Sequence, residues 1–362
     1  MDENLEKLQV ASPLLAKLVD GNDLMANEME ELCRAIFLYD TDGMHFAAFV
    51  GALHAKGETT QELLGFLNAT KSLAVKLDVD LDPDKVTDLS GTGGGEFKSL
   101  NVSTAASFVV AAAGYAVAKN SYYAVTGATG SADVFAALGI DLAKLGKAQI
   151  EQALVEVGIA PVFAPFISPQ MANRSRLSRK FFGERQIKVR TLFHLATNIF
   201  SPVAMNRRIY GCYSPDYLQT IAEVFQELGF KKTLVFHAEI GMPEISNSGT
   251  TTIIEQTGNS FQQYTISAQD LGVDEAAPAD LKSGGPEQNV ADFINILKGR
   301  QHGAKSDLVA INAGASLYSL GDTATIKEGV EKARGILADG SVFNKLRELT
   351  ERFGDAGALE KY

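Results

Sequence analysis

Cysteine is scarce in this sequence, with only two among 362 residues, and there is no excess of basic residues. Cys33 and Cys212 lie far apart, so they indicate neither a disulfide framework nor a cysteine-based metal site. The formal net charge of -11 argues against broad binding to nucleic acid, because such binding needs a basic face. A local basic pocket for a phosphorylated small molecule is compatible with that charge.

Long apolar runs are also missing. No uninterrupted stretch approaches the roughly 20 apolar residues that a membrane-spanning helix requires. The N-terminal segment MDENLEKLQV is acidic and has no hydrophobic core of the kind found in signal peptides. These absences predict a cytoplasmic protein that does not enter the membrane, and we expect an enzyme or a binding protein.

The order of apolar patterns along the chain predicts two domains. Residues 1–72 contain only patterns of helical spacing. From about residue 84, short β-type runs such as KVTDLS and YAVAK alternate with helical patterns, and TTTIIEQ and FQQYTIS suit a strand pair. Such alternation is typical of α/β proteins with a mostly parallel central sheet. We therefore predict a small all-helical domain over 1–72 and a larger α/β domain over 73–362.

A cluster of glycines follows the first predicted strand, in DLSGTGGGEFKSLNVST, residues 88–104. Glycines let backbone amides come close to an anion without a Cβ in the way. Ser103 is the predicted N-cap of the apolar helix that follows, which would turn the free amides of that helix toward the same space. Neither the dinucleotide-binding fingerprint nor the nucleotide P-loop occurs here. The loop and the helix start together predict a phosphate-binding site.

A second glycine turn follows the next predicted strand. Lys119 ends YAVAK, and TGATGS, residues 126–131, leads into a helix near Asp133. Two helix N-termini with a lysine between them suit a ligand that carries more than one phosphate group. A lysine at a strand end is otherwise usually solvated, so both interpretations of Lys119 stay open.

These motifs, in this order, resemble the core of anthranilate phosphoribosyltransferase, in the nucleoside phosphorylase/phosphoribosyltransferase superfamily. The matching segments include GTGGGEFKSLNVSTAASFVVAAAGYAVAK, TGATGSADVFAALGIDL, LVFHAEIGMPEIS and INAGASLY. The resemblance implies a helical domain that forms a homodimer, with helices from about 172–192 joining it, and an active site in the cleft beside the α/β domain. It also implies transfer of phosphoribose from phosphoribosyl pyrophosphate (PRPP), with Mg²⁺, to a nitrogen acceptor. In this family the acceptor is anthranilate, in tryptophan biosynthesis.

The resemblance assigns the donor half of the site to residues that match the family. Transfer at C1 of the ribose passes through an oxocarbenium-like state, so the main tasks are to stabilise the departing pyrophosphate and to orient the acceptor. The predicted phosphate contacts are Gly91, Thr92, Gly93, Gly94, Asn101, Ser103, Thr104, Lys119 and Ser131.

The acceptor half departs from the family. After the lysine the family reads His-Gly-Asn-Arg, where this chain has Asn120-Ser121-Tyr122-Tyr123. A histidine of the family is replaced by Ser168, and an arginine by Glu184. The acceptor-side candidates are therefore Tyr122, Tyr123, Ser168 and Glu184, and we expect an acceptor other than anthranilate.

The acidic residues that bind metal in the family are also changed. The Asp-Glu pair of the family is Pro243-Glu244 here, and the aspartate after GTGG is Gly95. Mg²⁺ accepts waters and substrate phosphates among its ligands. Glu244, with Glu239, could therefore still hold one phosphate-bound ion, and we expect a weakened metal site.

Two other interpretations stay open. One is a working anthranilate enzyme with substituted contacts. The other is a non-catalytic homologue that binds phosphate, a polyanion or a partner through a basic segment, although such a segment is also typical of a solvated helix face. The residues of this basic segment are Arg174, Arg176, Arg179, Lys180, Arg185, Lys188 and Arg190.

Overall fold

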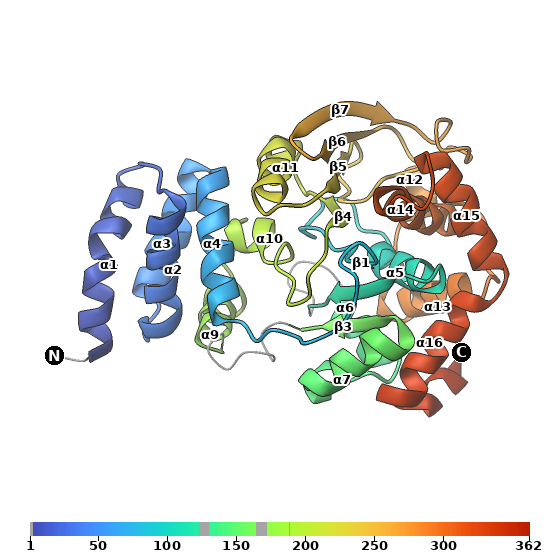
Figure 1. Ribbon diagram of the computed structural model, residues 1–362, viewed down its shortest axis with the longest axis horizontal. Helices are drawn as coiled ribbons and strands as arrows, with labels where there is room; N and C mark the ends of the chain where they lie inside the picture. Colours follow the sequence, from blue (N-terminus) through green and yellow to red (C-terminus); the bar gives the residue numbers. More distant parts are fainter. Residues whose placement is uncertain (1–2, 123–129, 164–171, 188) are drawn as a thin grey trace. The chain divides into compact units, whose positions relative to one another are not determined.

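The computed structural model describes residues 3–122, 130–163, 172–187 and 189–362. The acceptor-side candidates Tyr123 and Ser168 lie outside these described residues. The chain divides into two compact units, whose segments can be followed in Figure 1 by the colours that mark position in the sequence. The helical unit spans 1–76 and 164–202, and the α/β unit spans 77–163 and 203–362.

The helical unit consists of helices whose ends carry local capping groups. Thr59 and Glu62 form a capping box, in which Glu62 N donates to Thr59 Oγ1 at 3.3 Å and Thr59 N donates to Glu62 Oε2 at 2.9 Å. The Asp40 carboxylate accepts hydrogen bonds from the amides of Gly43 and Phe46, and so fixes the start of another helix. The helical segments are α1 (Glu3–Val19), α2 (Ala26–Tyr39), α3 (Met44–Lys56), α4 (Thr60–Leu73), α9 (Ala172–Ser178), the π-helical turn η4 (Arg179–Glu184) and α10 (Leu192–Ala196).

An aromatic cluster fills the core of the helical unit. The ring of Phe66 packs edge-on against Phe37 and Phe193, with centroid distances of 6.1 and 5.3 Å. The Arg174 guanidinium lies against the same three rings, 5.6, 5.2 and 5.1 Å from the centroids of Phe37, Phe66 and Phe193. It also donates to Thr197 Oγ1 at 2.9 Å. A buried arginine is therefore part of this core.

Two sheets form the centre of the α/β unit. In the first sheet β1, β2 and β3 are parallel and lie in that order. In the second sheet β4 and β5 are parallel, and β6 and β7 continue the sheet antiparallel. The α/β class and the strand pair expected from TTTIIEQ and FQQYTIS are confirmed. The strands are β1 (Val86–Thr87), β2 (Ala116–Asn120), β3 (Ile159–Val162), β4 (Arg207–Gly211), β5 (Lys232–Ala238), β6 (Thr251–Thr257) and β7 (Ser260–Ile266).

Helices pack around these sheets (Figure 1). The apolar helix α5 contacts β2, α14 and α16, and nearly all of its side chains are buried. The helices α14 and α15 approach closely at Gly314, where an added Cβ would lie 2.4 Å from Val330 N. The helical segments are α5 (Val102–Ala112), α6 (Ser131–Ala137), η1 (Leu142–Lys144), α7 (Lys147–Gln152), η2 (Ala153–Val157), η5 (Pro215–Tyr217), α11 (Leu218–Glu227), α12 (Pro278–Leu281), α13 (Pro286–Leu297), α14 (Ala304–Leu320), α15 (Ile326–Ala338), α16 (Ser341–Phe353) and η6 (Ala356–Lys361).

The two sheets adjoin along β1 and β4. Thr87 Oγ1 donates to the carbonyl of Arg207 at 3.1 Å, and the next residues of the two strands, Asp88 and Arg208, form an ion pair at 2.9 Å. The segment that follows β1 runs beside β4 to its carboxyl end, where Thr92 N donates to Gly211 O at 2.8 Å. The carboxyl ends of strands are where α/β proteins bind their ligands. Within the described ranges, every helix is too short or too polar to cross a lipid bilayer.

Candidate functional site

The glycine loop follows β1 and is seated on the end of β4. An added Cβ at Gly91 would lie 2.4 Å from Gly211 O, so only glycine fits at this position. Thr92 N donates to Gly211 O at 2.8 Å, and Tyr213 N donates to Thr92 Oγ1 at 2.8 Å. The hydroxyl of Thr92 is thus engaged within the protein, where it also donates to Gly93 O at 2.9 Å.

Gly93 and Gly94 form the tip of this loop. Both have positive φ, 61° and 71°, in the left-handed region that favours glycine. An added Cβ at either residue would meet no atom within 4 Å. The tip therefore presents backbone to open space, which is the arrangement that an anion-binding loop needs.

The helix α5 begins two residues earlier than the sequence indicates. Its N-cap is Asn101, and the prediction of Ser103 as N-cap is wrong. The reason is a distant contact, because Asn289 of α13 donates to Asn101 Oδ1 at 2.7 Å and accepts from Asn101 N at 3.3 Å. Ser103 lies partly exposed in the first turn. Thr104 Oγ1 is buried and has no hydrogen-bond partner among the described residues.

Lys119, near the end of β2, is 2% exposed and contacts Ser90, the residue that precedes the glycine loop. Its ammonium donates to Ser90 Oγ at 2.7 Å and to the carbonyl of Asn120 at 3.2 Å. Burial lowers the pKa of this ammonium and the Arg208 guanidinium lowers it further, whereas the carboxylates of Asp88 and Glu244 raise it. Lys119 is therefore a buried lysine, and the interpretation as a solvated lysine is wrong.

Asp88 connects the groups around Lys119, although sequence reasoning gave it no role. Its Oδ1 accepts from Ser90 N at 3.0 Å and from Ser90 Oγ at 2.7 Å. Its Oδ2 accepts from Asn120 Nδ2 at 3.2 Å and from Arg208 Nη2 at 2.9 Å. The signal in the sequence was the pair of arginines, Arg207 and Arg208, that opens the strand RRIYG.

The second turn brings Ser131 close to Tyr122. Tyr122 N donates to Ser131 Oγ, the first residue of α6, at 3.2 Å, and Ala132 N donates to Tyr122 O at 3.1 Å. The Tyr122 ring packs edge-on against Phe163 with a centroid distance of 5.7 Å. Tyr122 is partly exposed, so this aromatic pair reaches the surface near the end of β2.

The remaining acidic candidates occupy different settings. Glu184 is exposed at the end of η4 in the helical unit. Glu239 is exposed, and its Oε2 accepts from Thr250 Oγ1 at 3.0 Å. Burial raises the pKa of Glu244 to about 7, although the ammonium groups of Lys98 and Lys119 lower it. Glu244 thus shares the electrostatic environment of the glycine loop.

Gly95 and Pro243, which stand where the family has aspartates, lie against each other. An added Cβ at Gly95 would lie 2.5 Å from Pro243 Cδ and 2.8 Å from Gly241 O. No carboxylate side chain fits at residue 95 while Pro243 holds its place. In the part of the chain that the structure describes, no group of three His, Cys, Asp or Glu side chains is arranged to hold a metal ion.

Several residues of the basic segment serve the helical unit itself. Arg174 is buried in the aromatic core, as described above. Arg176 donates to the carbonyls of Asp40 and Thr41, and Lys180 donates to the carbonyl of Asp42. Arg179 and Arg185 are exposed, and Lys188 lies outside the described residues. The segment therefore contains both basic residues that bond within the helical unit and basic residues that are exposed.

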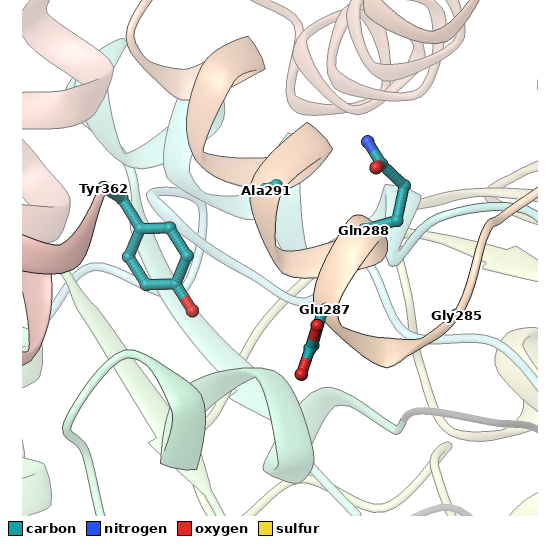
Figure 2. Close-up of a pocket in the computed structure, with 5 residues that line it drawn as sticks. All are labelled: Gly285, Glu287, Gln288, Ala291 and Tyr362. Atoms are coloured by element: carbon teal, nitrogen blue, oxygen red, sulfur yellow. The ribbon is translucent and has the colours of Figure 1, made fainter.

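A cavity of about 590 Å³ lies at the start of α13 (Figure 2). In Figure 2 the Glu287 carboxylate and the Tyr362 phenol lie on the same side of α13. No basic side chain occurs among the described residues that line this cavity, so it does not suit a phosphate group. The lining residues are Gly285, Glu287, Gln288, Ala291 and Tyr362.

Comparison with known proteins defines the class. Residues 83–343 match the model of the glycosyl transferase family, a/b domain, and residues 12–74 match that of the glycosyl transferase family, helical bundle domain. A helical bundle together with an α/β unit that carries this glycine loop identifies a glycosyltransferase of that family.

Individual relatives narrow the class to one family. The chain is 34% identical over 336 residues to anthranilate phosphoribosyltransferase of Desulfotalea psychrophila, covering 92% of this chain and 94% of the relative. It is 35% identical over 349 residues to that of Methanosarcina acetivorans, covering 96% and 91%. The chain belongs to the anthranilate phosphoribosyltransferase family and is a phosphoribosyltransferase.

Solved structures have the same fold. Anthranilate phosphoribosyltransferase from Thermus thermophilus aligns with a TM-score of 0.83 at 31% identity, covering 96% of this chain and 99% of that one. The enzyme from Saccharomyces cerevisiae in complex with PRPP and Mg aligns with a TM-score of 0.83 at 22% identity, covering 98% and 99%. At that lower identity the likeness establishes the fold alone.

Proposed function

We propose that this chain binds PRPP at the glycine loop and transfers its phosphoribosyl group to a nitrogen of an acceptor other than anthranilate. The observation that carries the donor half is the seated loop, with backbone open at Gly93 and Gly94 and the buried Lys119 bonded to Ser90 at the start of the loop. The yeast relative that binds PRPP and Mg supports the choice of donor.

In the proposed reaction the nitrogen lone pair forms a bond to C1 of the ribose. The C1–O bond breaks, its electron pair leaves with pyrophosphate, and the nitrogen then loses a proton to solvent. The backbone at Gly93 and Gly94 and the first turn of α5, including Ser103, would bind the phosphate oxygens. Stabilising the pyrophosphate as its charge develops lowers the barrier, because the carbon centre becomes oxocarbenium-like as that group departs.

The acceptor half rests on Tyr122. Its ring packs against Phe163 and is partly exposed near the end of β2, so the pair can offer an aromatic surface to a planar acceptor. An asparagine that could donate to a carboxylate is replaced here by a phenol ring. Loss of that amide favours an acceptor without the carboxylate of anthranilate.

Magnesium would enter this site with the donor. The only carboxylates proposed to take part are Glu244 and Glu239, and residue 95 cannot supply another while Pro243 is present. These residues fit at most one ion that also binds the pyrophosphate and water, consistent with the coordination habits of Mg²⁺. When bound, the ion would offset part of the negative charge of the phosphates.

Anthranilate itself is the second candidate acceptor, because relatives that are 34% and 35% identical over most of the chain are anthranilate phosphoribosyltransferases. The non-catalytic alternative has less support. Arg174 is buried in the aromatic core, and Arg176 and Lys180 donate to main-chain carbonyls of the helical unit.

The test is a turnover screen with PRPP, Mg²⁺ and a panel of aromatic amines and nucleobases that includes anthranilate. Pyrophosphate release and the mass of the N-ribosyl product are measured together. We expect product with an acceptor other than anthranilate. Preferred use of anthranilate would overturn the acceptor half, and PRPP binding without product from any acceptor would favour the non-catalytic alternative.

A matched pair of glycine variants serves as the control. Gly93→Ala and Gly258→Ala place a methyl group at similar positive φ, 61° and 55°, and neither new Cβ meets an atom within 4 Å. Gly258 lies in the turn between β6 and β7. We expect Gly93→Ala to lose product formation with every acceptor and Gly258→Ala to retain it. Equal activity of the two variants would contradict a role of the loop in donor binding.

A further inference from the structure

A buried asparagine of α13, Asn289, faces the start of α5. Asn289 and Phe293 are four residues apart, so both project from the same side of α13. The Phe293 ring packs edge-on against Phe108 of α5 with a centroid distance of 6.1 Å, and Asn289 is 1% exposed. This face of α13 is therefore fixed against α5. A side-chain amide in such a position is costly unless its polar atoms are bonded.

The two hydrogen bonds between Asn289 and Asn101 have a fixed direction. The main-chain amide of Asn101 can only donate, and it donates to Asn289 Oδ1 at 3.3 Å. With its oxygen turned to that amide, Asn289 directs its Nδ2 to Asn101 Oδ1 at 2.7 Å. The side-chain oxygen of Asn101 therefore faces α13, and its Nδ2, which carries two N–H donors, is turned away from this contact.

The Nδ2 group of Asn101 is placed to serve a ligand. Asn101 is partly exposed, and among the residues that the structure describes its Nδ2 has no hydrogen-bond partner. Asn101 is the N-cap of α5, but its side chain makes no capping bond to the helix. An N–H group stabilises a phosphate oxygen, whereas the oxygen of a reversed amide would repel it. The direction of this amide thus decides whether Asn101 attracts an anion.

A second hydrogen bond ties the same segment to the residues before α13. Ser283 N donates to Lys98 O at 3.1 Å. Residues 98–101, which connect the glycine loop to α5, are thus bonded at both ends to residues 283–289. A segment held in this way loses less conformational entropy when a ligand orders it.

We propose that Asn289 is a positioning residue, which turns the Asn101 amide so that its N–H groups, and not its oxygen, face the phosphates of the donor. This inference rests on the proposed function, because the donor is PRPP bound at the glycine loop and the first turn of α5. Asn289 is buried and acts through Asn101. It relays the direction of a main-chain N–H group to the side chain that contacts the donor.

The first test compares two buried side-chain amides. Asn289→Ala removes both bonds to Asn101. Gln256→Ala is the matched control, because Gln256 is 0% exposed and its amide donates to the carbonyls of Phe230 and Gly258 at 2.9 and 2.7 Å. We expect Asn289→Ala to raise the Kd for PRPP with Mg²⁺ about tenfold, a loss typical of one hydrogen bond to a charged group. Gln256→Ala should lower Tm to a similar extent and leave that Kd unchanged, and equal Kd values for the two variants would overturn the proposal.

Asn289→Asp tests the direction of the amide. Aspartate is similar in size to asparagine and still accepts from Asn101 N, but its carboxylate cannot donate to Asn101 Oδ1. The Asn101 side chain should therefore reverse, so that its Nδ2 donates to the carboxylate and its oxygen faces the phosphates. At pH 8 we expect a larger rise in the Kd for PRPP than Asn289→Ala produces. A Kd no higher than that of Asn289→Ala would contradict a role in setting this direction.

A double-mutant cycle with Asn101→Ala tests whether Asn289 acts through Asn101. In the Asn101→Ala background, Asn289→Ala should add little further loss of affinity. Any effect of Asn289→Asp that remains in this background is due to its charge, since no amide is left to reverse. An undiminished effect of Asn289→Ala in the Asn101→Ala background would overturn the proposal.

The two proposals fail in different ways. Folded wild-type protein that binds neither PRPP nor inorganic pyrophosphate would refute the proposed function, and this inference with it. Wild-type protein that binds PRPP, together with an Asn289→Ala variant of the same Kd, would refute the role of Asn289 and leave the proposed function standing.

Discussion

The α/β unit and the helical unit each bury an arginine, and they stabilise it differently. Arg208 pairs with a carboxylate, Asp88, whose other hydrogen bonds lead through Ser90 to Lys119 and the glycine loop. The guanidinium of Arg174 lies against the rings of three phenylalanines and donates to a threonine hydroxyl. The same residue type thus supports a ligand site in one unit and hydrophobic packing in the other.

This difference leads to distinct expectations for stability and binding. Loss of Arg208 should affect both, since its partner Asp88 organises the groups at the start of the loop. Loss of Arg174 should affect stability alone. Substitution by methionine, which has a similar length and no charge, probes both arginines in the same way.

The largest effect is expected for Arg208→Met. The substitution leaves Asp88 buried with its charge less compensated, which costs about 3–5 kcal/mol in the free energy of unfolding. PRPP affinity of the remaining folded protein should also fall. Chemical denaturation and calorimetry measure the two quantities. The double variant Asp88→Asn/Arg208→Met should recover much of the stability, and a double variant no more stable than Arg208→Met would contradict the pairing.

A smaller effect is expected for Arg174→Met. The variant loses the contacts with the phenylalanine rings and the bond to Thr197, worth about 2 kcal/mol together, and methionine fills part of the space. Urea unfolding should report this loss, while titration with PRPP should give the wild-type Kd. A clear drop in donor affinity would show that the two arginines do not have separate roles.

The smallest expected effect is a dependence of the free energy of unfolding on pH, which comes from His194 in the helical unit. Burial lowers the pKa of His194 to about 4, with a further contribution from Arg190, and the neutral ring accepts from Thr191 N at 3.3 Å. Because the folded pKa lies below that of the unfolded chain, the unfolded state binds more protons between pH 4 and 6.5. The contribution of His194 to the free energy of unfolding is fully present above about pH 6.5. It is lost as the pH falls toward 4, by about 1–2 kcal/mol after allowance for partial exposure of the ring.

Comparison of urea unfolding at pH 7 and pH 5 for wild type and His194→Asn measures this contribution. The variant should lose less stability than wild type on acidification. Equal losses in the two proteins would contradict the assignment to His194. After correction for the fraction of unfolded protein, the Kd for PRPP should be the same in wild type and in His194→Asn.

Local patterns in the sequence were sufficient for much of the fold and part of the site. The glycine loop is a local signal, since Gly93 and Gly94 are required by their own φ values. The strands β6 and β7 follow from adjacent β-type runs. In both cases the physical cause lies within a few residues of the pattern.

Contacts between distant segments account for what the sequence did not reveal. Serine is a residue type that often caps helices, and this favoured Ser103 as the N-cap of α5. The N-cap is instead Asn101, which is held by a hydrogen bond from Asn289, far along the chain. The Asp88–Arg208 pair joins strands separated by 120 residues, so neither residue indicated its partner. Arg176 was assigned to a basic surface because its hydrogen-bond partners were not evident from neighbouring residues. Those partners are the carbonyls of Asp40 and Thr41, more than a hundred residues earlier in the chain.

The most direct measurement is a calorimetric titration of the wild-type protein with PRPP in the presence of Mg²⁺. Saturable binding at a single site in each chain, with competition by inorganic pyrophosphate, is the expected result. A cooperatively folded sample that gives no binding heat, and no shift in Tm at high PRPP concentration, would contradict a donor site at the glycine loop.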